Sequence, residues 1–370
     1  MQQRVIISQD IEHDLAQAIA ETEHDRVFVL TDDITQECCL PKVAVLFAKH
    51  NATIITIRHD DTNKTLATLA DVWTALQRGG ATRHSLLVNL GGGMVTDLGG
   101  FAAATFKRGI NFINIPTTLL AMVDAAVGGK TGINFGGLKN EVGAFANARY
   151  VIVNTCFLDT LDTANLCSGY AEMLKHSLIS NAQMWAEHVN FDILQPDLAE
   201  LQRMVAASIA VKEHIVADDP HEHGIRKALN FGHTIGHALE EFSMQQPGGA
   251  VVSARLLPLA RARTAPKNTL LHGYAVAFGL IGELYISARK VGFPTARLHQ
   301  TARFIRENYG AVAFTCDDYP TLLNLMRHDK KNTSDTINFT LLHDIGDIRI
   351  NQTATDEEIR EALDFIREGY

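Results

Sequence analysis

The sequence has few cysteines and no pattern that would pair them. Cys38, Cys39, Cys156, Cys167 and Cys316 are odd in number, and none of them forms a CxxC spacing. A secreted domain stapled by disulfides carries many more cysteines for its length, usually in even number. The sparse cysteines therefore exclude a disulfide framework and indicate reduced thiols in the cytosol.

Long apolar runs and an excess of basic residues are also missing. The most apolar stretches are interrupted by Asp124 or Glu283, so none offers the about 20 consecutive apolar residues of a membrane-spanning helix. The N-terminus acquires acidic residues early and lacks the apolar core of a signal peptide. With 42 acidic against 33 basic residues, the formal charge of −9 argues against general nucleic-acid or anionic-membrane binding. We expect a soluble, cytoplasmic protein that acts on a small molecule.

The composition otherwise is that of an ordinary globular chain. Its 370 residues, 46% of them hydrophobic, are enough for two domains with separate cores. Up to about residue 160, short β-branched runs alternate with helical patterns, which predicts a parallel α/β sheet. Strands are expected at residues 26–31, 52–58, 85–90, 111–115 and 150–154, with helices at 66–76 and 95–105.

The second part of the chain has a different texture, dominated by long helical patterns. Helices are expected at residues 168–180, 197–216, 227–242, 273–291, 295–309 and 356–369, with one small hairpin at 337–342 and 347–350. We therefore predict an α/β domain with a Rossmann-like parallel sheet over residues 1–160. A mainly α-helical domain over residues 161–370 would follow it.

One segment fits neither pattern. Gln246–Asn268 carries a Gly-Gly pair, three prolines and several basic residues between two predicted helices. A connection of this length is unusual between helices. We interpret it as a solvated excursion at the surface, which is the common place for loops.

A glycine-rich turn follows the third predicted strand. Asn89–Phe101 reads NLGGGMVTDLGGF, a strand that runs through three glycines into a helix. Such a turn lets backbone N–H groups approach a phosphate at a helix N-terminus. The sequence departs from the common GxGxxG fingerprint, because Thr96 stands where the third glycine belongs. Taken alone, the turn is as compatible with a purely structural role as with a pyrophosphate-bearing cofactor.

Lysines and small polar residues crowd the stretch that follows. Residues 105–140 combine Lys-Arg-Gly, Pro-Thr-Thr, Gly-Gly-Lys-Thr and Lys-Asn groups with Asp124 in an otherwise apolar region. Each residue alone reads as a solvated surface group. Together, near so many glycine-bounded turns, they indicate an anion site lined by lysines.

Histidines and a carboxylate recur in the helical part. His233 and His237 are four residues apart and share one face of a predicted helix, and His272 opens another. Glu172 and Lys175 share a face of a third helix. Two histidines and one carboxylate with an open position form a catalytic zinc set. Spacing alone does not say which two histidines bind metal, although it favours His233 and His237.

Read together, these segments resemble one enzyme family. GGGMVTDLGGF, FKRGINFINIPTTLLAMVDAAVGGKTGIN, GLKNEVGAF, SGYAEMLKH, RKALNFGHTIGHALE, LHGYAVAFG and MRHDKKN occur in the order seen in 3-dehydroquinate synthases, from about residue 26 to the C-terminus. The resemblance implies a dehydroquinate synthase-like fold and a carbon–oxygen lyase of the shikimate pathway, which leads to chorismate and the aromatic amino acids. Its members convert 3-deoxy-D-arabino-heptulosonate 7-phosphate (DAHP) to 3-dehydroquinate and phosphate with catalytic NAD and a divalent metal.

The resemblance also implies roles for individual residues. Zinc or cobalt would be held by Glu172, His233 and His272, whereas His237 would lie beside the substrate phosphate. NAD would contact Asp32, Asp61, Lys64, Gly92, Gly93, Asp97, Thr117, Thr118, Lys130, Lys139, Phe157 and Thr160. Substrate would be bound by Asp124, Lys130, Asn140, Lys175, Lys212, Arg226, Asn230, His237 and Lys330. Arg108 resembles an arginine that family members lend across the interface of a homodimer.

Three features depart from the family pattern. The connection before His272 is roughly twenty residues longer than in the family, and this excess is the segment Gln246–Asn268. Ala164 and Asn165 replace the usual Arg-Glu pair, for which we expect a packing consequence only. Asp60 and Asp61 replace the usual Gly-Glu before Lys64.

Three other functions are compatible with parts of this pattern. Another sugar-phosphate cyclase, such as a 2-deoxy-scyllo-inosose or valiolone synthase, acts on a substrate without a carboxylate, so the pair Lys212 and Arg226 disfavours it. A metal-dependent polyol dehydrogenase usually has lysine where this chain has Gly100. A catalytically dead homologue is disfavoured because the chain retains Glu172, His233 and His272, assigned to metal, together with Lys130 and Lys175.

Overall fold

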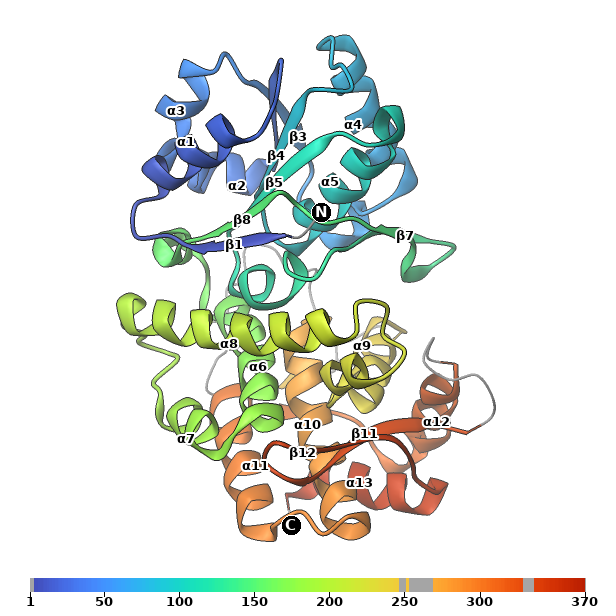
Figure 1. Ribbon diagram of the computed structural model, residues 1–370. Helices are drawn as coiled ribbons and strands as arrows, with labels where there is room; N and C mark the ends of the chain where they lie inside the picture. The colour runs from blue at the N-terminus through green and yellow to red at the C-terminus, as the bar shows by residue number, and fades with distance from the viewer. Residues whose placement is uncertain (1–2, 246–250, 253–268, 329–335, 370) are drawn as a thin grey trace. The chain divides into compact units, whose positions relative to one another are not determined.

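The computed structural model describes residues 3–245, 251–252, 269–328 and 336–369 (Figure 1). Lys330 and most of the segment Gln246–Asn268 lie outside the described residues. The chain divides into two compact units. The first comprises Met1–Leu161 and Asp197–Ile209, and the second comprises Asp162–Pro196 and Ala210–Tyr370.

The first unit is built on a parallel sheet of six strands in the order β1-β8-β5-β4-β2-β3. Its strands are β1 (Arg4–Ile7), β2 (Val27–Asp32), β3 (Thr53–Ile57), β4 (Leu86–Gly91), β5 (Asn111–Pro116) and β8 (Tyr150–Val153). Every residue of β2 and of β4 is buried, as expected for parallel strands covered on both faces. The predicted α/β class is confirmed.

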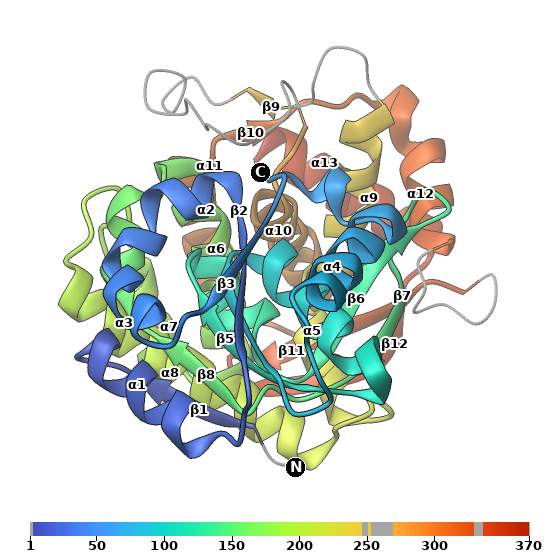
Figure 2. The same cartoon turned by 90° about the horizontal axis from the view of Figure 1, so that it is seen from above.

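Helices cover both faces of this sheet. α1 (Ile11–Glu21), α2 (Asp33–Cys38) and α3 (Ala44–Lys49) lie on one face, and α4 (Leu66–Arg78) and α5 (Gly93–Thr105) lie on the other (Figure 2). α5 lies so close to the sheet that a Cβ at Gly99 would meet the Asn89 side chain at 2.0 Å. Glycine within α5 therefore permits this close packing of helix on strand.

A hairpin that the sequence analysis did not expect follows the sheet's fifth strand. β6 (Lys130–Phe135) and β7 (Leu138–Phe145) pair antiparallel. Asn134 and Asn140 lie on this hairpin, so it carries polar groups toward the first unit's candidate site residues.

The second unit is mainly helical, as predicted. Its helices are α6 (Thr163–Ser180), α7 (Ala182–Asn190), α9 (His233–Gln245), α10 (His272–Lys290), α11 (Thr295–Tyr309), α12 (Tyr319–Arg327) and α13 (Asp356–Glu368), while α8 (Leu198–Asp218) continues from the first unit. Two short antiparallel pairs complete it: β11 (Asn338–Asp344) with β12 (Asp347–Thr353), and β9 (Val251–Val252) with β10 (Ala311–Val312). None of the described helices combines the length and apolar character that a bilayer crossing requires.

The helix predicted over residues 227–242 is wrong in its first part. Ile225–Asn230 form a 3₁₀ segment, and α9 begins only at His233. Gly232 separates the two with φ +81°, a left-handed conformation that interrupts an α-helix. The break makes His233 the first residue of α9.

Close backbone contact holds α10 against two other helices. A Cβ at Gly279 would lie 1.9 Å from the Gly232 carbonyl oxygen, and one at Gly273 would lie 1.8 Å from the Ser168 carbonyl oxygen. Only glycine permits this approach, because any side chain would collide with the neighbouring backbone. α6, α9 and α10 therefore bring their side chains to one place.

Candidate active site

Four side chains from α6, α9 and α10 meet inside the second unit. The Glu172 carboxylate is fully buried, and its Oε1 lies 3.3 Å from Nε2 of His233 and 3.3 Å from Nε2 of His272. Ring nitrogens of His233, His237 and His272 lie within 4.8 Å of one another. The structure therefore brings together all four groups that the sequence offered as metal ligands.

Hydrogen bonds orient the imidazole rings of His233 and His272. Nδ1 of His233 faces the Phe231 carbonyl oxygen at 3.1 Å, and Nδ1 of His272 faces Glu240 Oε2 at 3.0 Å. An acceptor at Nδ1 assigns the proton to that nitrogen and leaves the Nε2 lone pair available. Both available nitrogens point toward Glu172.

Neighbouring cationic and imidazole side chains compensate the charge of Glu172. Lys175, buried one helical turn further on, forms an ion pair with Oε2. Burial works against ionisation, yet the Lys175 ammonium and the His233 ring hold the pKa of Glu172 well below its usual value. A buried carboxylate beside imidazole nitrogens is a donor set suited to Zn²⁺ or Co²⁺.

The protonation of His272 also depends on carboxylates. Burial alone would lower the pKa of His272, but Glu240 and Glu172 raise it to about 10. Because a metal ligand must be a neutral imidazole, cation binding here would release a proton.

A second buried carboxylate fixes the start of α9. Glu283 of α10 accepts hydrogen bonds from the backbone N–H groups of Gly232 at 2.7 Å and Thr234 at 2.9 Å. These donors belong to the first turn of a helix, where they have no intrahelical acceptor and where the dipole favours a negative charge. Glu283 thereby holds the backbone that carries His233, a role that the sequence analysis did not identify.

Three of the residues assigned to substrate, Lys212, Arg226 and Asn230, lie on α8 and in the 3₁₀ segment Ile225–Asn230. Asp219 accepts from the backbone N–H groups of Gly224 and Arg226, which shapes the turn between them. Asn230 donates to Glu222 Oε1 at 2.6 Å, a partner that the sequence did not reveal. Arg226 and Lys212 are almost fully buried, at 2% and 6% exposure. Burial of two cations is unusual unless they serve an anion or a paired network.

In the first unit, the glycine turn leaves a helix N-terminus without a side-chain cap. α5 begins at Gly93 directly after Gly92, and no side chain accepts from its first turn. The Thr117 N–H group donates to the Gly91 carbonyl at 3.0 Å, which holds the end of β5 beside the turn. A Cβ at Gly92 would lie 3.0 Å from the Thr118 methyl group. Backbone N–H groups at a helix N-terminus of this kind bind a phosphate in other proteins.

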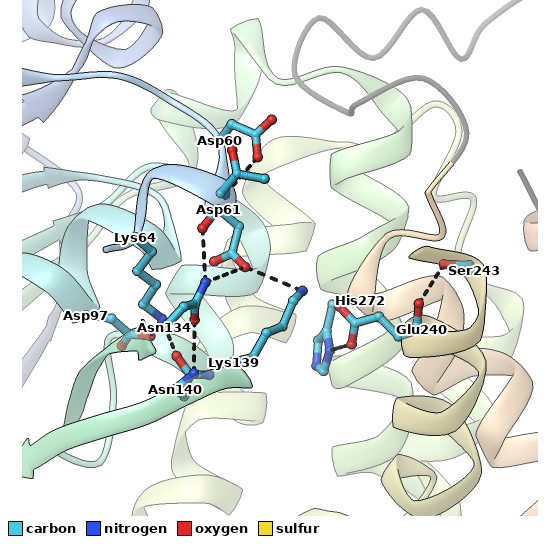
Figure 3. A network of polar contacts seen from close by, with 11 residues as sticks. Asp60, Asp61, Lys64, Asp97, Asn134, Lys139, Asn140, Glu240, Ser243 and His272 are labelled. Atoms are coloured by element: carbon cyan, nitrogen blue, oxygen red, sulfur yellow. Dashed lines mark hydrogen bonds and ion pairs between the residues drawn. The ribbon is translucent and has the colours of Figure 1, made fainter. Parts of the chain in front are cut away.

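A buried lysine organises the first unit's polar cluster (Figure 3). Lys64, 3% exposed, places Nζ 2.5 Å from Asp97 Oδ2 and 2.5 Å from Asn140 Oδ1. Burial raises the pKa of Asp97, and the Lys64 ammonium opposes that shift. This cluster joins Asp97 and Lys64, both assigned to NAD, with Asn140, which was assigned to substrate.

Asn134 connects this cluster to Asp61. Its amide nitrogen donates to the Asp61 backbone oxygen at 3.0 Å, and its Oδ1 accepts from the Asn140 N–H group at 2.9 Å. The Lys139 ammonium lies 3.4 Å from the Asp61 carboxylate. Sequence reasoning missed Asn134, because nothing in an isolated asparagine of a Gly-rich stretch signals a contact with a distant turn.

Asp32 caps a helix and Phe157 is buried in the core, so both side chains contribute to the fold. The Asp32 carboxylate caps α2 by accepting from the Thr35 N–H group at 2.8 Å and from its hydroxyl at 2.7 Å. Phe157 is buried at 1% exposure in a 3₁₀ segment, whereas Thr160 at the end of that segment is exposed. Their assigned cofactor contacts stay predictions.

Three further residues that the family resemblance assigned to substrate, cofactor or the dimer interface are Asp124, Lys130 and Arg108. Asp124 belongs to a π-helical turn over Ala121–Ala125, and Lys130 is the exposed first residue of β6. Arg108 is exposed in a turn where Lys107, Arg108 and Gly109 all have positive φ. Two non-glycine residues in that conformation store backbone strain, which is typical of functional positions.

Solved structures with this architecture define the class of fold. The chain is similar to a 2-deoxy-scyllo-inosose synthase at TM-score 0.81 and 22% identity, covering 98% of this chain and 95% of the other. It is similar to a 2-epi-5-epi-valiolone synthase from Streptomyces hygroscopicus at TM-score 0.79 and 24% identity, covering 99% and 97%. An iron-containing alcohol dehydrogenase from Thermotoga maritima matches at TM-score 0.62 and 14% identity, covering 98% and 97%. The chain therefore has the fold of these two synthases, and its architecture is also similar to that of the iron-containing alcohol dehydrogenase.

Sequence similarity is more specific. The model of the 3-dehydroquinate synthase N-terminal domain matches residues 54–168, and that of the C-terminal domain matches residues 169–257 and 260–332. A 3-dehydroquinate synthase from Parabacteroides distasonis is 51% identical over 369 residues, covering 100% of this chain and 99% of that protein. One from Clostridium tetani is 32% identical over 343 residues, covering 92% and 86%. The chain belongs to the 3-dehydroquinate synthase family.

Proposed function

We propose that this protein converts DAHP to 3-dehydroquinate and phosphate as an enzyme of the shikimate pathway, with catalytic NAD and a divalent metal. The observation that carries the proposal is the buried Glu172 carboxylate between His233 and His272, in a chain of this family. The reaction is a carbon–oxygen lyase reaction with no net change in the oxidation state of the cofactor.

Glu172, His233 and His272 would hold the metal, zinc or cobalt. Two observations support this choice: the Glu172 carboxylate is fully buried, and Nε2 of each histidine lies 3.3 Å from its Oε1. When bound, the cation supplies Lewis-acid polarisation of the substrate's hydroxyl oxygens. His237, on the same helix one turn after His233, would instead bind the phosphate of the substrate.

The first unit would bind NAD, which supplies a hydride acceptor that is regenerated in each turnover. The uncapped N-terminus of α5 supports pyrophosphate binding there, and the strands β4 and β5 place Thr117 and Thr118 beside it. Lys64 holds Asp97 in position through their buried ion pair. The proposed NAD contacts are Asp32, Asp61, Lys64, Gly92, Gly93, Asp97, Thr117, Thr118, Lys130, Lys139, Phe157 and Thr160.

Cationic and amide side chains would bind the two anionic groups of DAHP. Their charges neutralise the carboxylate and stabilise the phosphate as it leaves, which is a transition-state effect. The phosphate can itself accept the proton removed during elimination, so the protein needs to supply little general-base catalysis. The proposed contacts with the substrate as a whole, which also include the Asp124 carboxylate, are Asp124, Lys130, Asn140, Lys175, Lys212, Arg226, Asn230, His237 and Lys330.

We further propose a homodimer in the cytoplasm. Phe135, Leu138, Val142 and Phe145 of the β6–β7 hairpin are 39–57% exposed, which is the kind of apolar surface that a second subunit covers. The strained turn at Arg108 would present its guanidinium to the partner subunit, as the family resemblance implies. All five cysteines are free thiols, in keeping with a reducing compartment.

The test is turnover of DAHP by the purified protein with NAD far below the substrate concentration. We expect 3-dehydroquinate and phosphate in equal amounts, no accumulation of NADH, and loss of both products after treatment with a chelator. A sugar phosphate without a carboxylate serves as the matched control substrate and should not react. NADH formed in proportion to product would instead identify a dehydrogenase.

A further inference from the structure

The two ends of the long connection before His272 are tied together by one buried serine. Ser243, near the end of α9, donates from Oγ to the Glu240 carbonyl at 2.7 Å and accepts from the Leu270 N–H group at 3.1 Å. Ser243 and Leu270 are 1% and 2% exposed. The backbone two residues before His272 is therefore fixed to α9, whatever the length of the intervening segment.

Glu240 makes a second connection across the same gap. Its Oε2 lies 3.0 Å from His272 Nδ1, and the residue is 5% exposed (Figure 3). Glu240 follows His233 by seven residues on α9, about two helical turns, so both side chains occupy one face of the helix. The helix that contributes one ligand of the cluster thus also supplies the partner of another.

His233 and His272 differ in what holds them. The Nδ1 partner of His233 is a neutral backbone oxygen two residues away, in the same chain segment. The partner of His272 is a carboxylate that lies 32 residues away in sequence. A charged acceptor binds an imidazole N–H more strongly than a neutral one does and increases the basicity of the ring.

We propose that Glu240 is a positioning residue for the metal site, a role that rests on the proposed function. Its carboxylate accepts a hydrogen bond from the Nδ1–H group of His272, and this bond orients Nε2 toward Glu172. Ser243 assists by setting the register of Leu270–His272 along α9. Through this pair, the site tolerates the long insertion in front of a ligand.

Three substitutions, two at Glu240 and one at Ser243, separate the parts of this role. Glu240→Gln keeps an oxygen that can accept from Nδ1 but removes the charge, whereas Glu240→Ala removes both. Ser243→Ala leaves Glu240 in place and releases Leu270. Glu241→Ala is the matched control, because Glu241 is the exposed neighbour on the same helix.

The experiment measures Co²⁺ binding to the full-length protein by chelator competition, together with the visible d–d spectrum of the bound ion. We expect Glu240→Ala to weaken Co²⁺ binding about 10–100-fold and to change the spectrum. Glu240→Gln should restore part of the affinity, Ser243→Ala should have a smaller effect, and Glu241→Ala should match the wild type. Circular dichroism establishes folding, and if Glu240→Ala does not fold, Glu240→Gln decides the question.

The outcomes separate this inference from the proposed function. Unchanged Co²⁺ affinity and spectrum in Glu240→Ala, or in a Glu240→Gln variant that alone folds, would overturn the positioning role while leaving the metal site intact. A wild-type protein that binds no Co²⁺ would overturn the proposed metal site itself. Neither measurement requires substrate or turnover.

Discussion

The polar cluster around Lys64 and the cluster around Glu172 are built in different ways. The first uses side chains from a 3₁₀ turn, a helix and a partly exposed hairpin, and Asn140 adopts a positive φ of 50° to take part. The second uses three helices in backbone contact, with its carboxylate wholly buried. Packed helices fix the separation of their side chains far more tightly than turns do. The helix-borne cluster is therefore suited to holding an ion, and the other to groups that arrive and leave.

The largest effects should follow from removing a metal ligand. We expect His233→Ala and His272→Ala each to lose bound zinc and all measurable turnover, because an incomplete ligand set no longer retains the ion. His237→Ala should keep zinc and lose turnover, because it removes only stabilisation of charge on the phosphate. Metal analysis and phosphate release check this.

The opposite result would reassign the ligands. Zinc lost in His237→Ala but retained in His272→Ala would favour the pair His233 and His237, the pair that spacing alone suggested.

The next largest effect should come from a substitution that tests the backbone contact between α10 and the start of α9, beside the Glu172 cluster. Gly279→Ala places a methyl group where the Gly232 carbonyl oxygen lies 1.9 Å away. We expect α9 and α10 to separate, at a cost of about 1–3 kcal/mol in the free energy of unfolding, with weaker zinc binding. Arg289→Ala, at the exposed end of α10, is the control. Equal urea midpoints for the two variants would refute the close approach.

A substitution in the other cluster should act on the cofactor instead. Lys64→Met leaves the half-buried Asp97 without its cation, and Asn140 loses a partner. Because an unpaired buried charge is costly, we expect the cluster to rearrange and the Kd for NAD to rise about tenfold or more, which corresponds to at least 1.4 kcal/mol. Zinc content should stay at the wild-type value. Calorimetric titration with NAD checks the affinity, and an unchanged Kd would remove Lys64 from the cofactor site.

The contrast between the clusters also explains what the sequence could predict. Buried strands such as β2 and β4 and long helices such as α6 were predicted because their apolar composition is visible in a short stretch of sequence. The hairpin β6–β7 was missed because β7 is almost wholly exposed and has no buried face to produce a pattern.

In the candidate site, too, local patterns could be predicted and long-range contacts could not. Spacing located His233 and His237 within one helix, but the pairing of Glu172 with His272 came only from the family resemblance. Glu240 was missed because its partner lies 32 residues away in sequence. Contacts of that kind depend on helix packing, which no local pattern encodes.

The smallest effect should come from the insertion. Replacing Pro247–Lys267 with a short Gly/Ser linker removes the two-residue pairing of β9 with β10, but Ser243 still holds Leu270. Closing a longer or shorter loop changes the free energy of folding by only about 0.6 kcal/mol per doubling of length. We expect zinc content and turnover within severalfold of the parent. Turnover abolished with zinc and folding intact would assign the segment to the active site.

The most direct test of the account is a metal titration of the chelator-stripped protein, assayed with DAHP and catalytic NAD. The account predicts that turnover returns in proportion to added Zn²⁺ or Co²⁺ and saturates at one ion per chain, without build-up of NADH. It also predicts no recovery in a Glu172→Gln variant that remains folded. Full turnover in the stripped protein, or recovery in Glu172→Gln with the same stoichiometry, would contradict the assignment of Glu172, His233 and His272 as the metal site.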